Sequence, residues 1–100
     1  MLKVLWTEQA FLRLTEIESY ISLDNPAAAA RHTDRLIARA SVLAEQPYVG
    51  RTLPELPGSE LRELVEGNYR MVYRVREKRV EVLTVFEGHR QLPSEDLPDL

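Results

Sequence analysis

Apolar positions in the first half of the chain predict one short strand followed by two helices. The segment 2–6, LKVLW, alternates and is rich in β-prone residues, which indicates a strand. Over 8–23 the apolar residues recur at the spacing of an amphipathic helix, and the predicted buried stripe is Ala10, Leu14, Ile17 and Ile21. The second helix has a similar seam, made of Ala29, Thr33, Leu36, Ala40 and Leu43. Asn25 can cap this helix with Pro26 at its first position, so a short connection should join the helices as an antiparallel hairpin.

The second half of the chain predicts a loop and three strands. Prolines and glycines recur over 47–59, PYVGRTLPELPGS, and indicate a loop. Strands are predicted over 60–65, over 69–76 and over 80–86, because each is rich in strand-forming residues and turn residues separate them. The last strand is apolar on both faces, which suits a central position in a sheet.

These elements predict an α+β fold. An N-terminal strand and an antiparallel helical hairpin should pack with the hairpin on one face of a small, mainly antiparallel four-stranded sheet. We expect one domain over 1–92 and an acidic tail over 93–100 that frays. Side chains alternate along a strand, so the helix-covered face of the 69–76 strand should carry Tyr69, Met71, Tyr73 and Val75. Its other face should carry Arg70, Val72, Arg74 and Arg76, and should stay open unless a partner covers it.

Composition excludes several classes of protein. The chain has 100 residues, of which 44% are apolar and 29% charged, as is typical of a single globular domain. It has no cysteine and only two histidines, far apart in sequence, so we expect no metal site and no cofactor. The first residues do not have a secretory pattern and no apolar run reaches membrane-spanning length, so we expect a cytoplasmic protein.

Charge further restricts the possible partners. The net charge of −3 argues against nucleic-acid binding by diffuse attraction to phosphates. Lys3 and Lys78 are the only lysines among the 13 basic residues. Arginine suits planar, bidentate contacts to carboxylate or phosphate, so the chain favours specific sites over a diffuse cationic surface.

Seven sequence pieces in a fixed order resemble a known family. In the first half they are Thr7…Ala10…Leu14…Ile17…Tyr20-Ile21, then Asn25-Pro26-x-Ala28-Ala29, Leu43 and Pro47-x-x-Gly50-Arg51. In the second half they are Leu61-Arg62-Glu63-Leu64, Tyr69-Arg70-Met71-Val72-Tyr73-Arg74 and His89-Arg90. Over residues 2 to 92 the chain therefore resembles the RelE/ParE toxins of bacterial type II toxin–antitoxin modules.

The resemblance implies one of two activities. RelE-like members are ribosome-dependent endoribonucleases that cut mRNA, whereas ParE-like members inhibit DNA gyrase and block replication. A nuclease would use Arg51 and Arg70 to stabilise charge on the scissile phosphate and His89 to take a proton. The net acidity, the absence of lysine over 45–65 and the long hairpin with Asn25-Pro26 favour the ParE-like branch, for which no catalytic residue is expected.

The resemblance also implies the partners. A cognate antitoxin would fold on contact with the toxin, and DNA gyrase would be the target; ribosome and mRNA belong only to the nuclease alternative. A second alternative is a non-toxic binding module of the same fold. The candidate residues for antitoxin or target binding are Arg51, Arg62, Arg70, Arg74, His89 and Arg90. Structural roles remain open for some of them, because Arg62 can pair with Glu60 or Glu63, and Arg74 with Glu81 or Glu87.

Overall fold

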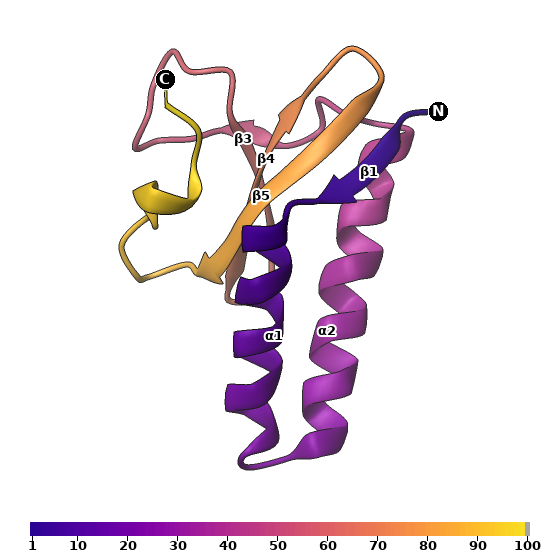
Figure 1. The fold of residues 1–100 in the computed structure, drawn as a ribbon, viewed down its shortest axis with the longest axis vertical. Helices are drawn as coiled ribbons and strands as arrows, with labels where there is room; N and C mark the ends of the chain where they lie inside the picture. The colour runs from indigo at the N-terminus through magenta and orange to yellow at the C-terminus, as the bar shows by residue number, and fades with distance from the viewer. Residues whose placement is uncertain (100) are drawn as a thin grey trace.

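The computed structural model describes residues 1–99 and has two layers, a helical hairpin against a five-stranded sheet (Figure 1). The helices are α1 (Glu8–Ser22) and α2 (Pro26–Ser41), with short 3-10 helices at Val42–Ala44 and Ser94–Asp96. The strands are β1 (Lys3–Trp6), β2 (Arg51–Thr52), β3 (Arg62–Glu66), β4 (Tyr69–Val75) and β5 (Arg79–Glu87). Their order is β1-β5-β4-β3-β2, and only β1 runs parallel to its neighbour, β5. The predicted α+β architecture is confirmed, and β5 lies inside the sheet as predicted.

Both helices begin where the sequence indicates. The Thr7 hydroxyl accepts a hydrogen bond from the Ala10 N–H at 3.1 Å, and the Asn25 side chain accepts one from the Ala28 N–H at 3.0 Å. Pro26 occupies the first turn of α2, where its missing N–H costs nothing. In residues 1–99 neither helix is long and apolar enough to cross a membrane.

The main core lies between the hairpin and the sheet. Its largest fully buried side chain is Tyr73 of β4, which packs with Leu36, Leu43 and Met71. The Tyr73 hydroxyl accepts a hydrogen bond from the Gly50 N–H at 2.9 Å, so the phenol is satisfied inside the core. The predicted helix-covered face of β4 is therefore confirmed.

The fifth strand, β2, was not predicted. Its two residues fall in the segment that the sequence indicates is a loop, and they pair Arg51 with Glu63 and Thr52 with Arg62. A two-residue strand has too few positions to show an alternating pattern. Its backbone pairing brings the Arg51 side chain next to β3.

A β-bulge changes the faces of β5. Val72 is paired with Thr84 but Tyr73 with Val82, so Leu83 is the extra residue on β5. Beyond it Val85 joins the core under the helices, whereas Leu83 and Phe86 join a second core on the opposite face. Simple alternation groups Phe86 with Val82, and the bulge reverses that assignment.

The sheet face opposite the helices is not open, contrary to the sequence-based expectation. A second core made of Leu53, Leu61, Val72, Leu83 and Phe86 lies there, with Leu56, Leu92 and Leu97 packed against it. The loop over 53–61 and the C-terminal segment thus cover this face, and they lie near one another (Figure 1). As a result Arg70 is only 8% exposed.

The C-terminal segment is attached to the fold by a buried carboxylate, which differs from the expected fraying. The Asp96 side chain is 1% exposed and accepts hydrogen bonds from Arg13 Nε at 2.7 Å and from the Thr84 hydroxyl at 2.8 Å. Burial alone would raise the pKa of Asp96, but the bonds from Arg13 and Thr84 outweigh burial and lower it. Together with Leu92 and Leu97, these contacts make the segment part of the second core.

Replacing Asp96 with asparagine should destabilise the protein by about 1–2 kcal/mol at neutral pH, because three hydrogen bonds, two from Arg13 and one from Thr84, lose their ionised acceptor. The lowered pKa means that the wild-type advantage is present above the unfolded-state value of about 3.9 and is lost as the pH falls through the lower folded-state value. Urea unfolding of both proteins between neutral and acidic pH measures this. If the difference in the free energy of unfolding between the two proteins does not narrow below about pH 4, the charge of Asp96 is not the cause of that difference.

Candidate functional site

Two of the candidate arginines flank a buried carboxylate on β3, the strand that lies between β2 and β4. Glu63 on β3 is fully buried, and it accepts hydrogen bonds from Arg51 Nε on β2 and from Arg70 Nε on β4, the latter at 2.6 Å. Both terminal nitrogens of Arg70 donate to Glu55 in the covering loop, each at 2.7 Å. We call Arg51, Glu55, Glu63 and Arg70 the charge cluster.

The charge cluster is neutral as a whole, with two guanidinium groups and two carboxylates. The bidentate bond to Glu55 and the bond to Glu63 raise the pKa of Arg70, against the opposing effect of burial. The same bond from Arg70 lowers the pKa of Glu55. Both groups are therefore ionised at neutral pH, and the positive charges already have partners.

The third predicted nuclease residue, His89, follows β5 and lies beside this cluster. Arg51, Arg70 and His89 line one shallow, open pocket, together with the turn residue Asn68 and Val65 of β3. The His89 side chain is 76% exposed, and its Nε2 lies 2.8 Å from a carboxylate oxygen of Glu87. The structure thus brings the three residues together, but each cationic or basic group contacts an acid.

The other candidate arginines are separate from this pocket. Arg62 donates to the backbone carbonyl of Gly50 at 2.7 Å and lies over the Tyr48 ring at 5.4 Å, rather than pairing with Glu60 or Glu63. Arg74 donates to Glu81 at 2.6 Å, which is one of the two internal pairs that the sequence left open.

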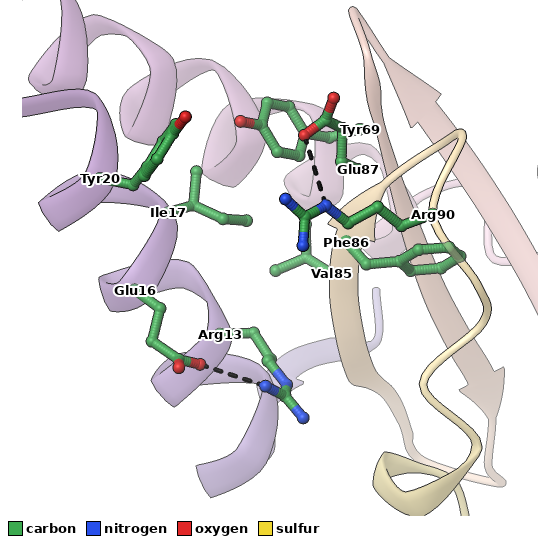
Figure 2. Close-up of a pocket in the computed structure, with 9 residues that line it drawn as sticks. All are labelled: Arg13, Glu16, Ile17, Tyr20, Tyr69, Val85, Phe86, Glu87 and Arg90. Atoms are coloured by element: carbon green, nitrogen blue, oxygen red, sulfur yellow. Dashed lines mark hydrogen bonds and ion pairs between the residues drawn. The ribbon is translucent and has the colours of Figure 1, made fainter.

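A groove runs between α1 and the ends of β4 and β5, with Arg90 at its rim (Figure 2). Its volume is about 230 Å³. Figure 2 shows Ile17 and Val85 at the apolar centre of the groove, with Tyr20 and Tyr69 along one side, whereas the Phe86 ring points away from the groove.

Two arginines and two glutamates line the groove, and Arg90 is the more exposed of the two arginines. Arg90 is 74% exposed and only loosely paired, with its Nε 3.8 Å from Glu87, and Arg13 lies between Glu16 and the C-terminal Asp96. Burial first, and then the nearby Glu87, raises the pKa of Tyr69, which therefore stays a neutral phenol. An apolar floor with exposed arginine and tyrosine at the rim is suited to a protein segment rather than to a small charged ligand.

Sequence reasoning missed the acids of the charge cluster and the α1 wall of the groove. Glu63 alternates correctly on its strand, but nothing local shows that a loop will bury it. The signal for the groove was visible, because Arg13 and Tyr20 lie at helical spacing on either side of Ile17, a member of the predicted buried stripe. Among residues 1–99 no three histidine or acidic side chains gather as a metal site would require.

Two solved structures share this fold. The chromosomal ParDE toxin–antitoxin system from P. aeruginosa contains a chain with a TM-score of 0.72 and 23% identity, covering 87% of this chain and 96% of that one. The RelBE2 toxin–antitoxin complex from Mycobacterium tuberculosis contains one with a TM-score of 0.62 and 22% identity, covering 86% and 96%. The hairpin packed on a mixed five-stranded sheet is therefore a fold that this chain shares with a chain from each of these two toxin–antitoxin systems.

Sequence comparisons identify the family. Residues 4–92 match the family model described as the ParE toxin of the type II toxin–antitoxin system parDE. Y4kP of Sinorhizobium fredii, a relative with a toxin name, is 41% identical over 95 residues, which is 91% of this chain and 93% of that protein. Toxin RelE2 of Caulobacter vibrioides is 45% identical over 65 residues, covering 65% and 69%. The chain belongs to the ParE toxin family of type II toxin–antitoxin systems.

Proposed function

We propose that this protein is a ParE-like toxin that inhibits DNA gyrase and is neutralised by a cognate antitoxin. The observation that carries the choice of activity is the pairing of Arg51 and Arg70 with Glu63 and Glu55. A nuclease of the RelE type needs cations free to stabilise a developing phosphate charge, and these two are already neutralised. The family match over residues 4–92 and the net charge of −3 support the same branch.

One observation favours the nuclease as the second candidate. Arg51, Arg70 and His89 do line one open pocket, and Arg51 is exposed enough to turn from Glu63 toward a bound phosphate. The similarity to a relative named toxin RelE2 also supports this reading. A phosphate would then have to displace Glu63, which has no other cation than Arg70 to pair with.

The antitoxin would bind in the groove beside α1. An amphipathic segment that folds on contact could pack an apolar side chain over Ile17 and Val85 and direct a carboxylate to Arg90. The sequence had suggested Arg70 and Arg74 for this role. Both arginines pair internally, Arg70 with Glu63 and Arg74 with Glu81. Among the candidate binding residues, Arg90 is the one that stands exposed at the groove.

The activity can be tested by pulse labelling of DNA and protein synthesis after induction of the toxin alone. We expect DNA synthesis to fall first while translation continues, and we expect the purified toxin to inhibit supercoiling by DNA gyrase. An early fall in translation, with no effect on supercoiling, would instead support the nuclease.

The antitoxin site makes a separate prediction. Tyr20→Ala and Arg90→Glu should each weaken antitoxin binding tenfold or more, about 1.4 kcal/mol, because both side chains stand at the rim of the groove and are 73% and 74% exposed. Calorimetric titration with the antitoxin measures this. Lys78→Glu, on the exposed β4–β5 turn, makes the same change in charge as Arg90→Glu and should bind like the wild type. Equal affinity for all four proteins would exclude the groove as the antitoxin site.

A further inference from the structure

Four of the eleven arginines form no ion pair within residues 1–99. The other seven pair with aspartate or glutamate, and they are Arg13, Arg51, Arg70, Arg74, Arg76, Arg79 and Arg90. The four without such a partner are Arg31, Arg35, Arg39 and Arg62, which we call the arginine strip. The chain has 16 acidic residues, so the absence of pairing is specific to this region rather than due to a shortage of acids.

The first three members form a row on α2. They are spaced four residues apart, and each step advances about 6 Å along the helix and turns about 40° around it. Arg31 and Arg35 are exposed and Arg39 is half-buried. The row therefore runs from the outer surface of α2 toward the strand on which α2 packs, β3.

Arg62 continues this row on β3. Arg62 lies opposite Tyr73 in the pairing of β3 with β4, and α2 packs on β3. Burial raises the pKa of Tyr73, and the positive charges of both Arg62 and Arg39 act to lower it, in agreement with this placement. Arg62 is held by the carbonyls of Gly50 and Tyr48, which leaves its charge without a carboxylate partner. The strip is thus continuous across two elements.

Apolar surface adjoins the strip at Arg62. Tyr48 is 65% exposed and Val49 is 47% exposed, and the Tyr48 ring stacks against the Arg62 guanidinium. Tyrosine and arginine are the residues most often found at the energetic centre of protein–protein interfaces. None of these residues lines the groove assigned to the antitoxin, so that groove and the strip are separate surfaces.

Like charges four residues apart destabilise an isolated helix, and Arg31, Arg35 and Arg39 form no ion pair within residues 1–99 that would offset the repulsion. Asp34, between Arg31 and Arg35 in sequence, forms no ion pair with either in the described chain. An external carboxylate surface would offset the repulsion and would suit the forked geometry of arginine. Nucleic acid fits less well, because four cations on a chain of net charge −3 neutralise few phosphates.

We propose that the arginine strip, with Tyr48 beside it, is the surface through which this toxin docks on an acidic protein surface of its target. This inference rests on the proposed function, because it takes DNA gyrase as that target. It assigns the antitoxin groove to residues of α1 and the ends of β4 and β5, and the target-docking surface to residues of α2 and β3. Loss of target docking therefore need not impair antitoxin binding.

The test compares two variants with the same change in net charge. Arg31→Glu/Arg35→Glu alters two exposed strip residues, and Arg76→Glu/Lys78→Glu alters two exposed residues at the β4–β5 turn. In a gyrase supercoiling assay, the strip variant should require at least tenfold more toxin than the wild type for half inhibition. The turn variant should match the wild type, and both should bind the antitoxin with unchanged affinity. Tyr48→Ala, which removes no charge, should also weaken inhibition.

The possible results distinguish a failure of the docking surface from a failure of the proposed function. Inhibition by the wild type with equal inhibition by the strip variant would overturn the docking surface and leave the proposed function standing. No inhibition by the wild type would overturn both. Binding of the wild-type toxin alone to a DNA duplex, lost in the strip variant, would make the strip a nucleic-acid surface and overturn the protein-docking proposal.

Discussion

Replacing Arg70 with methionine is expected to lower the free energy of unfolding by about 3–5 kcal/mol, because it leaves a buried carboxylate without its main partner. The Glu63 side chain is fully buried, and the Arg70 side chain beside it is only 10% exposed. Arg51, the other partner of Glu63, is 63% exposed and cannot shield the carboxylate from the apolar surroundings on the Arg70 side. Urea unfolding followed by the fluorescence of Trp6 measures the loss.

A double variant shows whether the loss comes from the isolated charge. Glu63→Leu combined with Arg70→Met removes both buried groups, while their remaining partners Arg51 and Glu55 can turn to solvent. The double variant should recover most of the stability that the single variant loses, since replacing both members of a buried pair with apolar groups is often neutral. Arg76→Met, whose ion-pair distances are 3.6 and 3.9 Å, should change stability by less than about 0.5 kcal/mol. A single variant as stable as the wild type would mean that water reaches Glu63.

The double variant also distinguishes the two activities. If Arg70 acts only through the fold, the folded double variant should still arrest growth when it is induced without antitoxin. A nuclease that uses Arg70 to stabilise the phosphate would lose activity even with its fold restored. Growth arrest and unfolding free energy measured on the same three proteins therefore separate a structural arginine from a catalytic one.

The hairpin and the succession of helices and strands along the chain, apart from β2, could be predicted from the sequence because their signals are local. Thr7 and Asn25 cap their own helices, and the apolar stripes follow a period that each helix sets for itself. The bulge at Leu83 and the two-residue β2 could not be predicted in this way. A bulge changes the pairing with a neighbouring strand, and nothing in the bulged strand alone specifies it.

The candidate site was predicted only in part for a related reason. Arg51, Arg70 and His89 lie near strand ends that the sheet brings together, and the family resemblance rather than the strand pattern indicated them. Their acidic partners depend on the covering loop, which brings Glu55 to Arg70 and buries Glu63. The conformation of that loop follows from packing on the second core rather than from its own sequence pattern. The arginine row on α2 was visible in the sequence, but its lack of partners became evident only when every acid had a position.

Replacing Gly50 with alanine is expected to lower the free energy of unfolding by at least about 3 kcal/mol, at the upper end of what overpacking costs. A Cβ atom at this position would lie 2.5 Å from the backbone carbonyl oxygen of Glu63 and 2.6 Å from the Tyr73 hydroxyl. The first of these atoms belongs to a paired strand and cannot rotate away. Relief would require β2 to separate from β3, and the buried hydrogen bond from the Gly50 N–H to Tyr73 would be lost with it.

Gly58→Ala is the control for this prediction, because it tests glycine replacement without crowding. Gly58 has a positive φ of 84°, but a Cβ atom added there would meet no other atom within 4 Å. Alanine at this position should therefore cost only the strain of the left-handed backbone, about 1–2 kcal/mol.

Adding Tyr73→Phe to Gly50→Ala should not restore stability, since the clash with the Glu63 carbonyl remains. Restoration would show that the phenol alone fixes the approach of β2. The same displacement of β2 would move Arg51 away from Glu63 and Arg62 away from the Gly50 carbonyl, so Gly50 positions both the charge cluster and the end of the arginine strip.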